Sequence, residues 1–285
     1  MMLLLPLLLL TPQAYDPEIE AVMNRPKKEE QRASTPRPSS SSSADGRIPV
    51  PEKYAAPFQA CLDEALASPD KGVAFAQKWR IEGGTFYARH CMGFAYARAE
   101  RWAPAMVAFE QAADEAERSG EMAQSARLWA QAGNAALAAG DAAKARSSFD
   151  AALARGLPDG VEKGETYLDR ARALVALADA KEARDSLDVA LAQVPQDPLA
   201  WLLSATLARR SGELKLAQAH IARAVQLSPD DASVALEEGN IAVLTDHDDV
   251  ARSAWQRAIR LAPQSPAGKA AADNLTRLPT GAPAR

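Results

Sequence analysis

The sequence predicts an all-α protein built from stacked antiparallel helical hairpins, and three observations lead to this fold class. A period of 34 residues runs through the C-terminal half of the 285-residue chain. Alanine-rich segments with few aromatic residues are typical of closely packed helices. No stretch shows the alternation of apolar and polar residues expected of a half-buried strand. A fixed period of this length is typical of a repeat protein, in which at least three units stack to bury their apolar faces.

The period is defined by positions that hold the same kind of residue in three consecutive units. Small residues stand where two antiparallel helices must approach closely, and large apolar residues fill the space between them. The recurring positions are Tyr167, Ala171, Ala183, Leu187, Ala190 and Pro195, then Trp201, Ala205, Ala217, Ile221, Ala224 and Pro229, then Ala235, Gly239, Ala251, Trp255, Ala258 and Pro263.

Each unit also carries signals for its two helices. In the unit at 198–231, Gly212 is expected to end the first helix at a tight turn. Pro229 is expected to stop the second helix because proline cannot continue it. Asp230 or Asp231 then caps the first helix of the next unit. Each unit is therefore predicted to form one helix–turn–helix hairpin.

This order of residues resembles the tetratricopeptide repeat (TPR), which implies a TPR-like α-α superhelix. The resemblance is gap-free over residues 164–265, and two earlier units match with insertions. The divergent segment 53–80 is interpreted as a further helical hairpin. The resulting helical repeat domain spans 53–285, with repeats at 86–119, 126–159, 164–197, 198–231 and 232–265 and a capping helix at 266–277.

The N-terminal segment differs from the repeats. Residues 1–14 contain an apolar run of about ten residues that ends near Ala14, which is typical of a secretory signal peptide. The run is too short to span a bilayer as a helix. Residues 15–52 are first charged and then rich in serine and proline, a composition that predicts a disordered tether. These features predict export to the periplasm or cell envelope. If residues 1–14 are not a signal, the protein is cytoplasmic.

The sequence predicts no enzymatic activity, metal or cofactor. The three histidines, His90, His220 and His247, are far apart and form no metal-binding pattern. The acidic run around His247 is interpreted as the turn before a helix, because acidic residues stabilise the start of a helix. No segment outside the repeats is long enough for a catalytic domain. The net charge of −4 and the lack of a basic stripe argue against nucleic-acid binding.

The only cysteines, Cys61 and Cys91, fall on the first helices of two successive hairpins. Those helices are neighbours in a stack, and a separation of 30 residues is close to one repeat. Export would place both thiols in an oxidising compartment. A disulfide is therefore one interpretation, and two buried small apolar side chains are the other.

The resemblance implies a concave groove lined by the first helices, where an extended peptide or a partner helix binds. Carried over by position, the groove residues are Tyr87, His90, Phe94, Arg98, Arg127, Asn134, Asp169, Arg172, Thr206, Arg209 and Asn240. Asn134 and Asn240 stand where TPR proteins often hold an asparagine that bonds to a ligand backbone. The set that clamps a terminal carboxylate is incomplete. Arg98, Arg127 and Arg172 are expected to be exposed and to pair with acidic groups of a partner.

The resemblance thus implies a non-catalytic scaffold for protein–protein interaction. The alternatives are an accessory or regulatory subunit of an enzyme of envelope assembly, or a cytoplasmic adaptor. Neither the identity of the partner nor the oligomeric state follows from the sequence.

Overall fold

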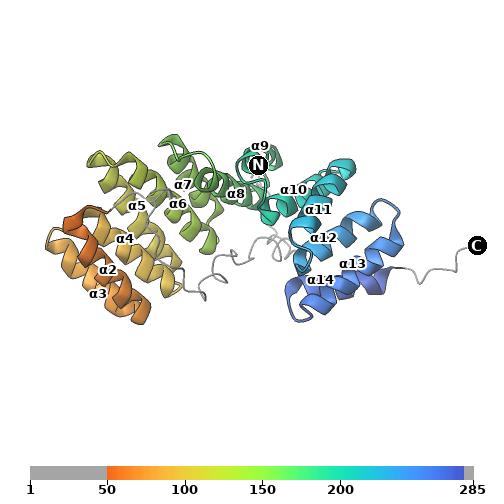
Figure 1. Cartoon of the computed structure of the whole chain (residues 1–285), viewed down its shortest axis with the longest axis horizontal. Helices are drawn as coiled ribbons and strands as arrows, with labels where there is room; N and C mark the ends of the chain where they lie inside the picture. Colours follow the sequence, from red (N-terminus) through yellow and green to blue (C-terminus); the bar gives the residue numbers. More distant parts are fainter. Residues whose placement is uncertain (1–49, 279–285) are drawn as a thin grey trace, which may run out of the picture. The chain divides into compact units, whose positions relative to one another are not determined.

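The prediction of an all-α protein built from helical hairpins is confirmed. A computed structural model describes residues 50–278, and these residues form thirteen α-helices (Figure 1). The chain divides between Ala200 and Trp201 into two compact units, each described by itself below. The predicted signal peptide at 1–14 and nearly all of the predicted tether at 15–52 lie outside the described residues.

The unit that ends at Ala200 holds eight complete helices, each packed on the next along the chain. Consecutive helices contact each other as in a series of hairpins. In addition, α2 packs on α4, and α6 packs on α8. The helices are α2 (Glu52–Ala67), α3 (Pro69–Ile81), α4 (Thr85–Arg98), α5 (Trp102–Arg118), α6 (Met122–Ala138), α7 (Ala142–Ala154), α8 (Val161–Ala176) and α9 (Ala180–Gln193).

The unit that begins at Trp201 contains most of α10 and four further helices. Within it α12 packs on α11, α13 and α14, and α13 packs on α14. The helices are α10 (Pro198–Arg210), α11 (Leu214–Leu227), α12 (Ala232–Val243), α13 (Asp248–Leu261) and α14 (Pro266–Arg277).

The helix ends follow the signals in the sequence. Gly212 has a φ of +76°, a left-handed conformation that glycine adopts without a steric cost, and it follows the end of α10. Helix α11 ends two residues before Pro229. The Asp231 carboxylate accepts hydrogen bonds from the backbone N–H groups of Ser233 and Val234, at 2.8 and 3.2 Å, and so caps α12.

The close approach of the two helices in a hairpin depends on a small residue facing a large ring. A Cβ atom added to Gly133 of α6 would lie 2.5 Å from Cε1 of Phe149 in α7, which is far inside van der Waals contact. A Cβ atom on Gly239 of α12 would likewise lie 2.5 Å from Cδ1 of Trp255 in α13. The small residues of the repeat pattern therefore make room for the aromatic residues of the following helix.

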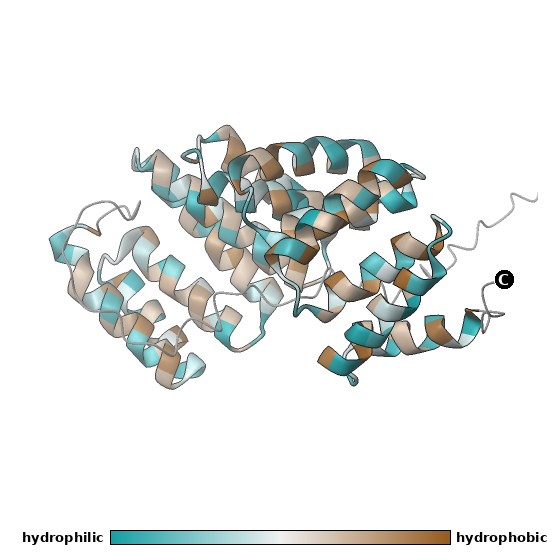
Figure 2. Cartoon of the chain, turned by 45° about the vertical axis from the view of Figure 1, so that its right-hand side comes forward, coloured by the Kyte–Doolittle hydropathy of each residue, from teal (hydrophilic) through white to brown (hydrophobic). Residues whose placement is uncertain are grey.

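Apolar and polar residues are mixed along the helices, as Figure 2 shows. The buried core is rich in alanine and contains the large side chains of Phe149, Leu187, Ile221 and Trp255. In the part of the chain that the structure describes, no helix is both long and apolar enough to cross a membrane.

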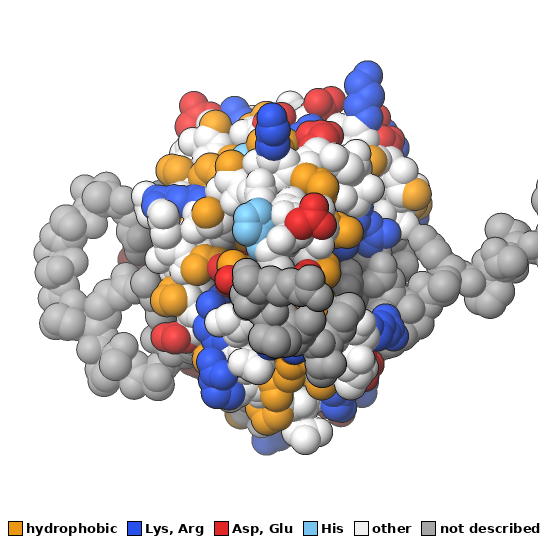
Figure 3. Space-filling model, turned by 90° about the vertical axis from the view of Figure 1, so that its right-hand side faces the viewer, with side chains coloured by type: hydrophobic (Ala, Val, Ile, Leu, Met, Phe, Trp, Pro, Cys, Tyr) orange, Lys and Arg blue, Asp and Glu red, His pale blue; other side chains and the backbone are white. Residues whose placement is uncertain are grey.

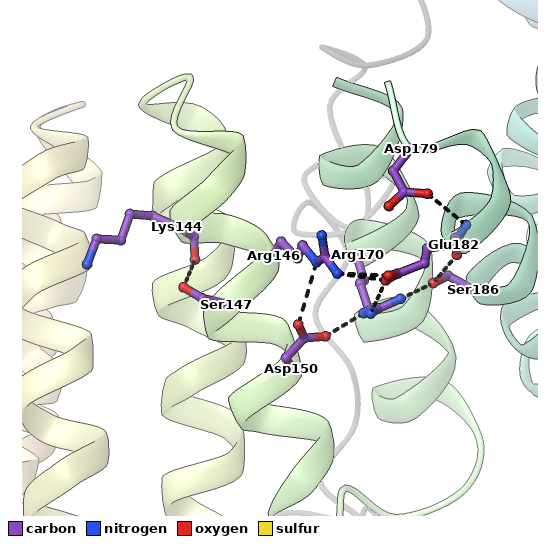
Figure 4. Close-up of polar contacts among 8 residues, drawn as sticks. All are labelled: Lys144, Arg146, Ser147, Asp150, Arg170, Asp179, Glu182 and Ser186. Atoms are coloured by element: carbon purple, nitrogen blue, oxygen red, sulfur yellow. Dashed lines mark hydrogen bonds and ion pairs between the residues drawn. The ribbon is translucent and has the colours of Figure 1, made fainter. Parts of the chain in front are cut away.

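A polar network joins three helices of the compact unit that ends at Ala200 (Figure 4). Arg170 of α8 donates to Asp150 of α7 at 2.6 Å and to Glu182 of α9 at 2.9 Å. Arg146 of α7 also donates to Glu182, at 2.8 Å, and Arg170 reaches Ser186 at 2.7 Å. The two arginines and two carboxylates balance in charge, so this network ties consecutive hairpins together and offers no net charge to a ligand.

Candidate functional site

A pocket of about 330 Å³ opens in the unit that begins at Trp201. It is formed by the C-terminal halves of α10, α12 and α14 together with one ring from α13. These three helices are the first helices of two hairpins and the capping helix, so the pocket lies on the face where the TPR resemblance predicts a groove. Its lining residues are Arg209, Asn240, Val243, Leu244, Trp255, Asn274, Arg277 and Leu278.

The 34-residue period explains why these residues meet. Arg209, Val243 and Arg277 are successive steps of 34 along the chain, as are Asn240 and Asn274. Leu244 and Leu278 form a third such pair. Stacking brings equivalent positions of successive units side by side, so three positions of the repeat supply seven of the lining residues. The eighth, Trp255, belongs to the core of the hairpin.

Asn240 is at the centre of the polar side of the pocket. Its Oδ1 accepts hydrogen bonds from Trp255 Nε1 and from Asn274 Nδ2, both at 3.0 Å. Asn240 is only 4% exposed, and its orientation is fixed by these two donors. Gly239 is required here because a larger residue would displace the Trp255 ring that provides one of them.

A nearly buried ion pair supports the pocket. Arg209 Nε donates to Glu237 Oε1 at 2.7 Å, and the side chains of Arg209 and Glu237 are 14% and 3% exposed. Removing a buried charge from water is costly unless it is paired. The pair therefore holds the Arg209 guanidinium at the pocket wall.

Of the predicted groove residues, the structure brings Arg209 and Asn240 together in the pocket. Thr206 is 7% exposed, and its hydroxyl donates to the Leu202 carbonyl at 2.9 Å. Thr206 thus bonds within its own helix and does not line the pocket.

The remaining predicted groove residues lie in the other unit, and two of them are buried. Tyr87 is 3% exposed because the rings of Tyr54 and Phe58, from the N-terminal hairpin, cover it at centroid distances of 5.0 and 5.7 Å. Asp169 is 1% exposed and accepts a hydrogen bond from Arg172 at 3.1 Å. Tyr87, Asp169 and Thr206 are therefore inside the fold, and Asn240 is also buried although it lines the pocket.

The three arginines expected to be exposed differ in their surroundings. Arg98, at the end of α4, is exposed. Arg127 is 22% exposed and donates to both carboxylate oxygens of Glu162, at 2.7 and 2.8 Å. Arg172 is only 14% exposed. The expectation of exposure is therefore wrong for Arg127 and Arg172, because each already pairs with an acidic residue of this chain.

Asn134 is exposed on α6, and Phe94 and His90 are partly buried on α4. The His90 ring lies 5.1 Å from the ring of Phe58 and 6.0 Å from that of Phe109. Burial lowers the pKa of His90 from 6.5 to about 4, while a hydrogen bond with Gln131 acts in the opposite direction. The imidazole is therefore neutral in the folded protein at neutral pH.

The lowered pKa of His90 predicts that the protein loses stability in weak acid. The unfolded chain binds a proton at His90 below about pH 6.5, whereas the folded protein does so only near pH 4. The contribution of His90 is therefore complete above pH 6.5 and is lost between pH 6.5 and 4. Urea unfolding at pH 7.5 and 5 is expected to show a smaller loss of stability for His90→Gln than for the wild type. His247→Gln, which alters an exposed histidine, serves as the control; equal pH dependence of wild type and His90→Gln would contradict the prediction.

Cys61 of α2 and Cys91 of α4 form a disulfide in the structure, with their Cα atoms 6.2 Å apart. Both residues are fully buried. The bond links the divergent N-terminal hairpin to the first helix of the repeat at 86–119, where α2 also packs on α4.

Sequence reasoning missed six of the eight lining residues: Val243, Leu244 and Trp255 from the repeat at 232–265, and Asn274, Arg277 and Leu278 at the end of the capping helix. Asn274, Arg277 and Leu278 complete the pocket, yet the sequence pattern assigns the segment 266–277 only a capping role. The signal was present, because the 34-residue step from Asn240 leads to a second asparagine at 274. Residues 50–278 contain no group of three or more His, Cys, Asp or Glu side chains that could hold a metal ion.

Comparison with known proteins supports the fold. No protein-family model and no curated protein matches the sequence. Among solved structures, PilF of Pseudomonas aeruginosa superposes with a TM-score of 0.63 at 15% identity, over 79% of this chain and 100% of that chain. YrrB, described as a TPR protein with an unusual peptide-binding site, superposes with a TM-score of 0.53 at 18% identity, over 66% and 91%. A thermophilic TPR protein of Thermus thermophilus gives a TM-score of 0.51 at 18% identity, over 67% and 99%. The chain therefore has the fold of the tetratricopeptide-repeat proteins.

Proposed function

We propose that this protein is a non-catalytic scaffold that binds another protein through the pocket on α10, α12 and α14. The bound element is an extended peptide or a partner helix. The observation that carries the proposal is the pocket itself, in which amide and guanidinium groups surround an apolar wall at positions set by the repeat. Mostly apolar sites with a few fixed polar groups are typical of ligand binding.

The lining residues favour binding over catalysis. The described residues of the pocket are arginines, asparagines and apolar side chains. This set contains neither a nucleophile nor a side chain that exchanges protons near neutral pH. A peptide-binding site is also named in the description of YrrB, which has the same fold. An accessory subunit of an envelope enzyme would use this surface in the same way, to hold a partner.

Site-specific photo-crosslinking tests the proposal. Leu244 lines the pocket and is 51% exposed, so a photoreactive phenylalanine analogue placed there would face a bound partner. Val250 on α13 is 40% exposed and does not line the pocket, which makes it the matched control. Irradiation of cells is expected to give a defined protein adduct from position 244 and not from position 250. Adducts of equal yield from both positions, or from neither, would contradict binding at the pocket.

We propose in addition that the protein acts in the periplasm or cell envelope. Two observations support this location: the apolar run in residues 1–14, which is typical of a secretory signal, and the Cys61–Cys91 disulfide, a bond kept mainly in oxidising compartments. Export is expected to give a mature protein that begins at Tyr15 in a periplasmic fraction, as measured by mass spectrometry. Full-length protein found only in the cytosol would contradict this location.

A further inference from the structure

We infer that the pocket on α10, α12 and α14 selects a protein segment in which an acidic side chain stands next to a large apolar one. Arg277 would contact the acidic group, and Leu244 and its neighbours would contact the apolar group. The inference rests on the proposed function and specifies the chemistry of the segment that this pocket binds.

The apolar half of the pocket is suited to one large side chain. Leu244 is 51% exposed at the end of α12 and forms part of the pocket wall. Val243, the Trp255 ring and Leu278 line the same pocket; Trp255 and Leu278 are buried, and Val243 is partly buried. A volume of about 330 Å³ is at the lower end for ligand sites, so the pocket accepts one or two side chains of a longer segment.

The polar half of the pocket carries positive charge. Arg209 is paired with Glu237, which is buried and is not among the lining residues. Arg277 is exposed at the last turn of α14, at the rim of the pocket. The described lining residues include no carboxylate. The planar guanidinium group forms paired hydrogen bonds with a carboxylate, so an acidic side chain is the complementary ligand.

The helix ends nearby do not reverse this preference. Helices α10, α12 and α14 end at Arg210, Val243 and Arg277, so their carbonyl ends lie near the pocket. A helix C-terminus carries a partial negative charge that would disfavour an anion. Backbone N–H groups of the turns bond to these carbonyls, for example Glu213 N to Ala208 O at 2.8 Å and His247 N to Ala242 O at 3.0 Å. These carbonyls are therefore partly satisfied within the fold, and the full charge of the exposed Arg277 exceeds the partial charge of any one helix end.

The asparagines position the bound segment beside Arg277. Asn274 donates to Asn240, and a side-chain amide has two N–H groups, so this bond uses only one of its donors. Arg277 stands three residues after Asn274, on the same face of α14. A carboxylate at the Arg277 guanidinium therefore lies within one helical turn of an amide that can bond to the segment.

The acidic preference can be measured by selecting peptides from a random pool, which does not require the partner to be identified. The probe is a library of random dodecapeptides displayed on phage, fused through their C-termini so that no terminal carboxylate is free. Selection on the purified full-length protein is expected to enrich peptides with Asp or Glu within two positions of Leu, Ile, Phe or Trp. Selection on Arg277→Glu is expected to lose this acidic residue or to replace it with Lys or Arg.

A charge-matched control separates a local contact from general electrostatics. Arg260, exposed in the last turn of α13, does not line the pocket. An enriched peptide is expected to bind Arg277→Ala about tenfold more weakly than the wild type, as follows from a hydrogen bond to a charged group. Arg260→Ala is expected to leave its affinity unchanged. Fluorescence anisotropy of the labelled peptide measures both values.

The outcomes distinguish the inference from the proposed function. Enriched peptides without an acidic residue, or equal losses for Arg277→Ala and Arg260→Ala, would overturn the inference and leave peptide binding intact. Failure to enrich any peptide, together with no adduct from position 244, would overturn both.

Discussion

Phe149→Ala is expected to destabilise the compact unit that ends at Ala200 by about 3–5 kcal/mol, the usual cost of removing a large ring from a core. Phe149 is fully buried and packs with Ala136, Ala145 and Ala173, which are also fully buried. Met106 and Leu137 pack against the same cluster, but the fully buried neighbours are alanines, which cannot extend into the space that the ring leaves, so a cavity remains. Urea unfolding followed by circular dichroism is expected to shift to lower urea concentrations.

Two further variants separate the cavity from other effects. Phe149→Leu keeps most of the apolar volume and is expected to lose much less stability. Gly133→Ala retains the Phe149 side chain but adds a Cβ atom that would lie 2.5 Å from its Cε1 atom. This variant is therefore expected to destabilise the hairpin by overpacking. Because stability in a repeat protein depends on contacts between neighbours, hydrogen exchange resolved by segment identifies where the loss occurs. Exchange in α6 and α7 that is unchanged in Phe149→Ala would contradict this role of the ring.

The hairpins could be predicted from the sequence because their signals are local and periodic. Pro195, Pro229 and Pro263 mark the ends of units, and Gly212 marks a turn that needs a positive φ. The aromatic residue opposite a glycine could be predicted for the same reason, since Trp255 stands 16 residues after Gly239 in a fixed pattern.

The exposure of the groove residues could not be predicted, because it depends on what the neighbouring helix carries. Tyr87 is covered by Tyr54 and Phe58 of a hairpin that diverges from the repeat pattern. Arg127 meets Glu162 across 35 residues, a separation that includes the insertion between two repeats. A polar residue at a groove position therefore becomes part of the fold when an adjacent unit supplies a partner, and long-range pairs of this kind leave no periodic signal.

The position of the pocket was predictable in part. The register of the repeat places Arg209 and Asn240 in the groove, and they do line one pocket. The contribution of α14 required the capping helix to follow the same register as the repeats, which a pattern defined on two-helix units does not reveal. On the face that Figure 3 shows, acidic and basic side chains are interspersed, so surface charge alone does not identify the site.

Loss of the Cys61–Cys91 disulfide is expected to cost about 3.5 kcal/mol, as estimated from the closure entropy of a loop of this length. The bond closes a loop of 30 residues that contains the end of α2, all of α3 and most of the first half of α4. Without it, the N-terminal hairpin is held on α4 by packing alone, including the contact of Phe58 with Tyr87. The hairpin is therefore expected to unfold before the rest of its unit when the bond is absent.

Reduction and substitution test this expectation in complementary ways. Unfolding of the wild type with and without dithiothreitol changes only the covalent bond, because both sulfur atoms stay in the buried site. Cys61→Ala together with Cys91→Ala removes the sulfur atoms as well and is expected to lose somewhat more stability than reduction. Hydrogen exchange is expected to increase in α2 and α3 on reduction and to stay unchanged in α12 and α13, which lie in the other unit. If the oxidised and reduced proteins unfold at the same urea concentration, or if both thiols of the native protein react with a labelling reagent before any reductant is added, then Cys61 and Cys91 are only two buried apolar side chains and the N-terminal hairpin depends on packing throughout.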